Sequence, residues 1–172
     1  MVDVIPKLFI TGSEYRIIVT DRSCDDLCDS NQLSKDELSF NKIKWIHSLD
    51  STRLIANMFR YANGQSLKIP KYLNDERPPF WAFKDKTPPP NESFDQFREK
   101  AQNDISIFNK MKQLRAYFWY EIKYLNKHYE EENLIILSHF IIKETAMMTE
   151  EDVHICRNQK HKFDMIQGEK YA

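Results

Sequence analysis

Residues 133–148, "NLIILSHFIIKETAMM", contain an aliphatic run that ends in Ser-His. Residues 134–137 are consecutive apolar residues, typical of a strand buried on both faces of a sheet. A helix-like pattern follows over about 140–149. Ligands of parallel sheets gather where the strands end, so we expect His139 to lie at a candidate site.

The segments before this strand alternate between strand-like and helix-like patterns. Residues 7–10, 15–20 and 43–46 are predicted to be strands. An apolar stripe at helical spacing predicts a helix from residue 51 to residue 62. Residues 74–91 contain five prolines and are predicted to form a loop.

The longest predicted element is a helix around residues 92–130, because this stretch has no glycine or proline and its apolar residues recur every three or four positions. Strands alternating with helices predict an α/β domain with a largely parallel sheet and helices on both faces. The sequence thus indicates a single domain over residues 1–172, with 150–172 as a polar C-terminal tail.

The composition is that of a globular protein: 172 residues, 41% hydrophobic and 30% charged, with a formal net charge of −1. Such a balance gives no general attraction to nucleic acid or to anionic membranes. The apolar runs are too short to span a bilayer, and we see no targeting peptide at the N-terminus. We therefore expect an intracellular protein, either cytoplasmic or organellar, with mitochondria among the organelles that fit.

The numbers of glycine and cysteine residues limit the kinds of binding site that this chain can form. Only three glycines occur in the chain, which excludes a glycine-rich phosphate loop. An odd number of cysteines indicates reduced thiols. Cys24 and Cys28 have a C-x3-C spacing, and a zinc site would need further ligands from Cys156, His154 and His161. We favour free thiols and expect neither a metal nor another cofactor.

Five segments resemble, in the same order, motifs of the histidine phosphatase superfamily, whose members have the phosphoglycerate mutase-like fold. The segments are "NQLSKDEL", "HSLDSTRLIANMF", "LNDERPPFW", "TPPPNESFDQFREKAQ" and "LIILSHFIIKETAMM". The resemblance implies a serine-containing loop at Ser48, a phosphate-binding Arg53, an acidic proton donor at Asp75 or Glu76, and a second active-site histidine at His139.

The same resemblance implies an Arg-His-Gly triplet after the first strand, whose histidine attacks phosphorus. This chain lacks the triplet. If the family's first strand is aligned with residues 7–10, "TGS" at 11–13 stands in its place, and if it is aligned with residues 15–20, "TDR" at 20–22 does. A carboxylate there would repel phosphate and could not act as the nucleophile. Phe140 and Ile141 also follow the Ser-His pair, where the family has glycine.

Two functions remain open. The first is a non-catalytic histidine phosphatase-like domain that serves as a structural or accessory subunit, a scaffold, in a larger assembly. The alternative is a phosphatase or phosphomutase, or a module that binds a phosphorylated ligand or another anion through Arg53 and His139. In the simplest interpretation, His139 is an ordinary strand-end histidine, and Asp75 and Glu76 are solvated loop carboxylates.

The aromatic stretch 116–129, "AYFWYEIKYLNKHY", cannot place all its rings on one face of a helix, because successive residues are about 100° apart. Aromatic residues outside a core often mark interfaces. We therefore expect contacts with other protein chains, unless residues 150–172 fold back over the rings. The predicted interface residues are Trp119, Tyr120 and Tyr124, with Phe80 and Trp81 as weaker candidates.

Overall fold

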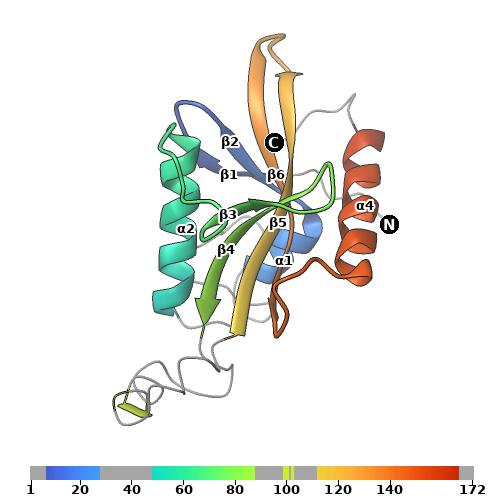
Figure 1. Cartoon of the computed structure of the whole chain (residues 1–172). Coiled ribbons are helices and arrows are strands. Elements are labelled where there is room, and N and C mark those ends of the chain that lie inside the picture. Colours follow the sequence, from blue (N-terminus) through green and yellow to red (C-terminus); the bar gives the residue numbers. More distant parts are fainter. Residues whose placement is uncertain (1–6, 28–47, 88–98, 101, 103–111, 167–172) are drawn as a thin grey trace.

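A six-stranded mixed sheet forms the centre of the molecule (Figure 1). The computed structural model describes residues 7–27, 48–87, 99, 100, 102 and 112–166. The strand order is β1-β2-β6-β5-β4-β3. Only β2 and β6 pair in parallel, and the other neighbours are antiparallel. The predicted largely parallel α/β sheet is therefore wrong.

The elements of the described part have the following bounds. The strands are β1 (Lys7–Thr11), β2 (Arg16–Val19), β3 (Leu73–Asp75), β4 (Trp81–Thr87), β5 (Lys112–Leu125) and β6 (Glu131–Lys143). The helices are α1 (Asp21–Leu27), α2 (Ser48–Ala62) and α4 (Glu150–Met165). The expected strands at 7–10 and 15–20 are present as β1 and β2, whereas the expected strand at 43–46 lies outside the described residues.

The predicted long helix around 92–130 is wrong over residues 112–125, which form β5. Six consecutive residues of this strand, 114–119, are buried, because β5 is covered on both faces. When both faces of a strand are buried, its apolar residues match the helical period as well as the two-residue period of a strand. The many aromatic residues fit the pleated surface of a strand.

The chain after Ser138 also differs from the prediction. β6 continues to Lys143, so the expected helix at 140–149 is wrong. The helix begins at Glu150, after an N-terminal capping box in which the Thr149 hydroxyl accepts from the backbone of Asp152 and the Asp152 carboxylate accepts from the backbone of Thr149. Most of the expected polar tail is therefore helix α4.

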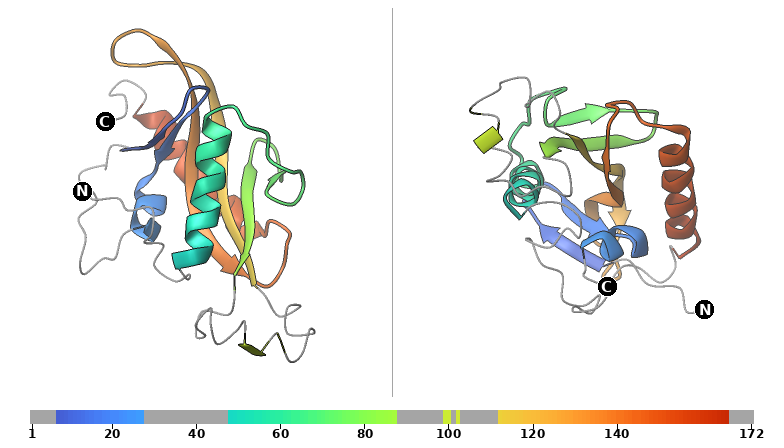
Figure 2. Two further views of the ribbon diagram at one scale, coloured as in Figure 1. Left: turned by 90° about the vertical axis from the view of Figure 1, so that its left-hand side faces the viewer. Right: turned by 90° about the horizontal axis from the view of Figure 1, so that it is seen from below.

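The two longer helices cover opposite faces of the sheet (Figure 2). The face under α2, here called the α2 face, is an apolar core containing Leu54, Ile55, Met58, Phe83 and Phe118. The opposite face, here called the α4 face, packs a second apolar core that includes Tyr117, Trp119, Val153, Cys156 and Phe163. Fully burying one such large side chain contributes about 1.5–3 kcal/mol, so both helices are held mainly by apolar packing.

Two outer features complete the fold. α1 is joined to β6 by a hydrogen bond of 2.9 Å from the Phe140 amide to the Asp26 carboxylate. The pairing of β4 with β5 ends at Phe118, and that of β2 with β6 begins at Leu134. Beyond these points β5 and β6 pair only with each other, and their hairpin projects from the sheet (Figure 1).

None of the helices in the described ranges has the length and hydropathy needed to cross a membrane.

Candidate functional sites

His139 lies within β6 rather than at its end, on the α4 face. Its Nδ1 atom is 2.8 Å from the Ser138 hydroxyl, and its Nε2 atom is 3.2 Å from Oδ1 of Asp152 on α4. The three residues have relative exposures of 0%, 1% and 1%. This Ser-His-Asp chain resembles a hydrolytic triad in composition, but a substrate cannot reach it in the folded chain.

The Asp152 carboxylate is the centre of this buried network. It accepts hydrogen bonds from the Lys143 ammonium at 2.7 Å, the Thr149 amide at 3.1 Å and the Thr149 hydroxyl at 2.9 Å. Burial alone would raise the pKa of Asp152, but the hydrogen bonds from His139, Lys143 and Thr149 hold it well below its ordinary value. Asp152 is therefore an anion that ties β6 to the first turn of α4.

The rest of the network keeps His139 neutral. Burial lowers its pKa, although the hydrogen bond to Asp152 acts in the opposite direction. The Tyr117 ring lies 5.1 Å from the imidazole, and Cys156 Sγ lies 3.9 Å from its Nδ1 atom. Burial raises the pKa of the Cys156 thiol to about 12. A neutral imidazole beside an inert thiol has a structural role here, and the described residues contain no cluster that could hold a metal.

Arg53 lies on the α2 side and does not meet His139. Its Nε atom donates to Asp85 Oδ2 at 2.6 Å, and its Nη2 atom donates to Asp85 Oδ1. This bidentate pair joins α2 to β4 at the rim of the α2 face. The predicted convergence of Arg53, His139 and an acidic residue is therefore not found.

The other predicted pocket residues are also dispersed. Ser48 is the first residue of α2, and Asp75 is exposed at the end of β3. Glu76 is half-buried and has a pKa raised by burial. Its backbone amide bonds the Phe80 carbonyl at 3.0 Å, which continues the β3–β4 ladder and places its side chain on the α4 face. Of the predicted pocket residues, Glu76 alone shares a sheet face with His139.

The predicted interface residues separate into two groups. Trp119 is fully buried under Phe163 of α4, with ring centroids 6.1 Å apart, and packs on Phe80 at 6.4 Å. Tyr124 is half-buried, and its ring centroid is 5.8 Å from that of Phe163. Trp119 and Phe80 thus belong to the domain's own core and are not part of its surface.

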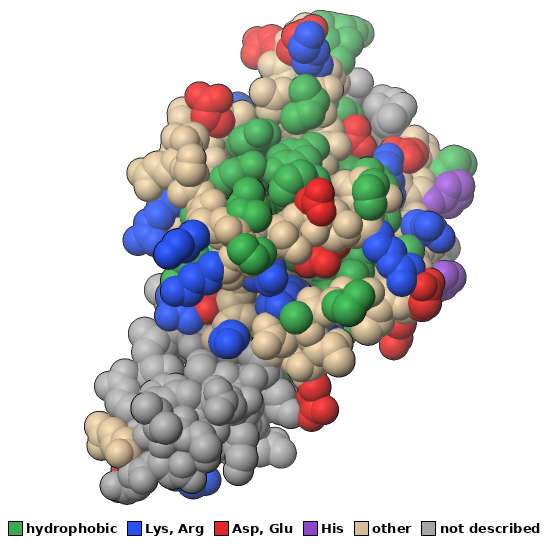
Figure 3. Space-filling view, in the orientation of Figure 1, with side chains coloured by type: hydrophobic (Ala, Val, Ile, Leu, Met, Phe, Trp, Pro, Cys, Tyr) green, Lys and Arg blue, Asp and Glu red, His purple; other side chains and the backbone are tan. Residues whose placement is uncertain are grey.

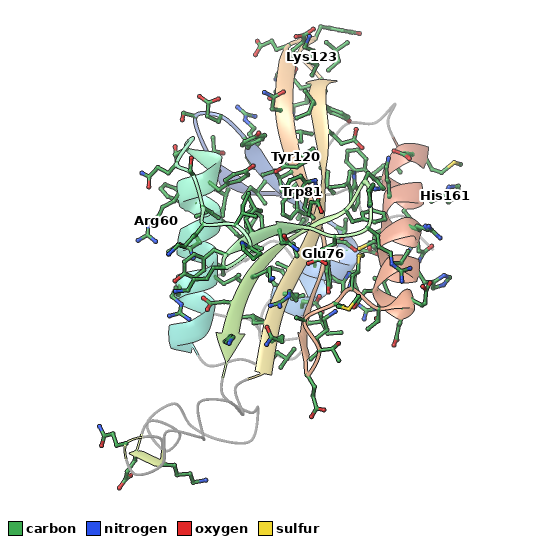
Figure 4. All side chains as sticks on the ribbon, viewed as in Figure 1. Arg60, Glu76, Trp81, Tyr120, Lys123 and His161 are labelled. Atoms are coloured by element: carbon green, nitrogen blue, oxygen red, sulfur yellow. The ribbon has the colours of Figure 1, made fainter. Side chains whose placement is uncertain are left out.

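Tyr120 and Trp81 point to the other face and remain half-exposed. They form, with Tyr15 and Tyr61, a group of four half-exposed rings that we call the aromatic patch. Tyr15 stacks on Tyr61 at a centroid distance of 5.5 Å. Tyr120 lies 5.7 Å from Tyr15 and 5.7 Å from Trp81. The hydrophobic surface below the hairpin in Figure 3 coincides with Tyr120 and Trp81 as labelled in Figure 4.

Gly12 allows the β1–β2 turn to sit against the end of α2. A Cβ atom at this position would lie 2.2 Å from the Ala62 carbonyl oxygen. That oxygen accepts from the backbone amides of Glu14 at 2.9 Å and Tyr15 at 3.0 Å. The close approach brings Tyr15 onto Tyr61, so the patch depends on a contact that a side chain at position 12 would prevent.

The polar atoms of the patch are partly paired. The hydroxyls of Tyr61 and Tyr120 are 2.6 Å apart, so one donates to the other and the accepting hydroxyl keeps its own proton. Burial, followed by the hydrogen bond with Tyr61, raises the pKa of Tyr120. Among the described residues, the Trp81 indole N–H has no hydrogen-bond partner. The patch is therefore uncharged and has donors available.

The sequence indicated Tyr120 and Trp81 as interface candidates but gave no reason to join them to Tyr15 and Tyr61. These four residues come from four separate segments, and only the sheet order brings them together. Only Tyr120 has an alternation of apolar and polar residues near it, because Glu121 and Lys123 separate Tyr120, Ile122 and Tyr124.

No protein family model matches this chain, and no curated protein or solved structure matches it either. The resemblance to the histidine phosphatases stays a prediction, and the parallel fold that it implied is wrong.

Proposed function

We propose that this protein is a non-catalytic interaction domain whose aromatic patch binds an extended, proline-containing segment of another protein chain. The observation that carries this proposal is the gathering of four half-exposed aromatic rings, from four separate segments, into one uncharged surface. Large contiguous apolar patches on soluble domains mark binding sites.

The chemistry of the patch favours a polyproline II segment over a helix. Such a segment has no internal hydrogen bonds, so its carbonyls are free to accept. Domains that recognise it use aromatic-lined grooves in which proline rings pack on tyrosine and tryptophan. The Trp81 indole N–H and one hydroxyl of the Tyr61–Tyr120 pair supply donors of this kind.

The neighbouring hairpin enlarges the same surface. Ile122 is two residues beyond Tyr120 on β5, in the β-bulge where the pairing with β6 shifts between Glu121 and Tyr124. It is 55% exposed. An apolar side chain beside the rings extends the contact area available to a partner without adding charge.

Surface plasmon resonance with the immobilised protein tests the proposal directly. An oligoproline peptide should bind, and a Gly-Ser peptide of equal length should not. Trp81→Ala and Tyr120→Ala should each weaken binding by about 2 kcal/mol, or roughly 30-fold, as expected for an aromatic anchor. Tyr129→Ala is the matched control, because Tyr129 is an 83% exposed tyrosine outside the patch.

The proposal would be overturned by a failure of oligoproline to bind, or by equal affinities for the Trp81→Ala and Tyr129→Ala variants. Circular dichroism of each variant separates lost binding from lost folding.

The non-catalytic part of the proposal rests on the buried position of His139 and on the missing Arg-His-Gly triplet. Incubation with a generic phosphate monoester should give no turnover and no phosphohistidine. Turnover that disappears in a folded His139→Ala variant would contradict it.

A further inference from the structure

Two basic residues face each other directly across neighbouring strands on the α4 face. Lys84 of β4 is paired with Arg115 of β5 in the sheet register. Both alternate with residues of the α2 face, such as Phe83 and Leu114, so both side chains point toward the α4 side. Like charges at directly opposed positions destabilise a sheet, and such a pair indicates that something compensates it.

Arg115 lacks the partner that a buried guanidinium normally has. Its relative exposure is 1%, and burial lowers its pKa. Nη1 donates to the carbonyls of Asp85 at 3.2 Å and Leu114 at 2.9 Å, and Nη2 donates to the Gln113 side chain at 2.8 Å. All three acceptors are neutral. No carboxylate of the described residues lies within ion-pair distance of Arg115, and its buried Nε atom has no hydrogen-bond partner there.

Glu76 is the acidic residue on this part of the face, and it too is incompletely paired. Its Oε1 atom is buried and has no hydrogen-bond partner among the described residues. Lys84 and Arg115 act on its pKa, yet burial is the larger influence and raises it. None of the ion pairs within the described ranges joins Glu76 to either cation. Figure 4 shows Glu76 at the β3–β4 corner, between the two helices.

The residue between these charges is small. Ala82 precedes Lys84 by two positions on the same side of β4, and it is paired with Asn74 of β3 and Tyr117 of β5. Asn74 and Tyr117 lie beside Ala82 on this face, and Glu76, Lys84 and Arg115 lie further out. One unpaired buried donor, Arg115 Nε, and one unpaired buried acceptor, Glu76 Oε1, on the same face require an explanation, and a bound ion supplies one.

We propose that Glu76, Lys84 and Arg115 bind a small oxyanion, namely the carboxylate or phosphate group of a small molecule. The Arg115 Nε–H and the Lys84 ammonium donate to the anion, which removes the repulsion between the two cations. Glu76 in its protonated form donates to a further oxygen. This site lies on the α4 face and is independent of the aromatic patch.

Isothermal titration calorimetry of the full chain tests the site, with inorganic phosphate and acetate as the probes at constant ionic strength. At least one probe should bind saturably with one site per chain. Lys84→Gln should weaken binding at least about tenfold, because it removes a charge-assisted hydrogen bond. Lys127→Gln is the matched control, since Lys127 is exposed at the hairpin tip, and it should leave the affinity unchanged.

Glu76→Gln keeps a donor but cannot ionise. It should retain binding, because the amide N–H can donate to the anion in place of the protonated carboxyl group. Binding of phosphate alone or of acetate alone would support the site and identify its ligand class. Absence of saturable binding for both probes would overturn the proposal, as would equal affinities for the Lys84→Gln and Lys127→Gln variants.

Discussion

On each face of the sheet, an ion pair joins a strand to a helix, but the pair under α2 and the pair under α4 differ in their exposure to solvent. On the α2 face the charged link is the Arg53–Asp85 pair, in which the arginine side chain is 52% exposed and the aspartate side chain is 3% exposed. On the α4 face the link is Asp152 with His139 and Lys143, and the Asp152 side chain is 1% exposed. Exposed ion pairs contribute little, whereas breaking a buried one leaves an unpaired charge inside the protein.

Among the described residues, the group of exposed aromatic rings lies on the α2 face because α4 covers the aromatic residues of the other face. α4 closes over Trp119 and over the network around Asp152, so its face is occupied by the chain itself. α2 leaves the corner below the hairpin uncovered, where Tyr15, Tyr61, Trp81 and Tyr120 remain half-exposed. Substitutions beneath α4, at Trp119 or Asp152, should therefore affect stability, and those at the corner should affect binding to the aromatic patch.

The largest expected effect is that of Trp119→Ala. Removing this fully buried indole from beneath Phe163 should lower the free energy of unfolding by about 4 kcal/mol. Denaturation in guanidinium chloride measures the change. Trp81→Ala is the matched variant from the other face and should cost clearly less. Equal losses for the two variants would mean that the faces are not distinguished in this way.

Trp119 also shows what the sequence could and could not predict. The apolar run at 134–137 correctly indicated a central buried strand. The stretch around Trp119 was assigned to a helix because both faces of β5 are buried, and an apolar pattern on both faces does not define a single period. The absence of glycine and proline removed the usual signs of an element boundary.

The site was harder to predict than the strands. Thr149 and Asp152 form an S/T-x-x-D pattern that signals the start of a helix, and reading it would have located α4. The contacts of Asp152 with Lys143 and His139, however, depend on how α4 packs on β6. Glu76 was singled out from the sequence, but Lys84 and Arg115 come together only through strand register, which local patterns do not define.

The next largest effect is that of Asp152→Asn. This change leaves the Lys143 ammonium without its buried counter-ion and replaces one carboxylate oxygen with an NH2 donor. If the remaining amide oxygen accepts from His139, the NH2 group faces the donors of Lys143 and Thr149. A loss of about 3 kcal/mol in the free energy of unfolding is expected, as for other broken buried pairs. Glu151→Gln, one residue earlier and exposed, should change stability by less than about 0.5 kcal/mol. A tolerated Asp152→Asn would show that the network is dispensable.

The pH dependence of stability gives a smaller effect with a defined sign. The pKa of His139 is lowered in the folded protein, so the unfolded chain binds the proton first. Stability should fall as pH decreases below about 6.5, the ordinary value for histidine, by up to about 1.4 kcal/mol per pH unit. Urea denaturation between neutral and mildly acidic pH measures this slope. His154→Gln, at an exposed position on α4, should retain it, whereas His139→Gln should reduce it.

The smallest effect is that of Arg53→Met on the α2 face. The Arg53 side chain is 52% exposed but the Asp85 side chain is only 3% exposed, so the pair is partly screened by solvent. The change should cost about 1 kcal/mol, because the Lys86 amide still donates to the Asp85 carboxylate. Thermal denaturation of the variant beside Asp152→Asn compares the two faces directly. A loss for Arg53→Met as large as that for Asp152→Asn would contradict the distinction between exposed and buried links.

The most direct test of the account is amide hydrogen exchange of the wild-type protein with and without an oligoproline peptide. We expect the peptide to slow exchange near Tyr15, at the end of α2, at the start of β4 and around Tyr120, while exchange in α4 stays unchanged. Protection that appears in α4 instead, or no added protection at the corner, would contradict the assignment of binding to the α2 face.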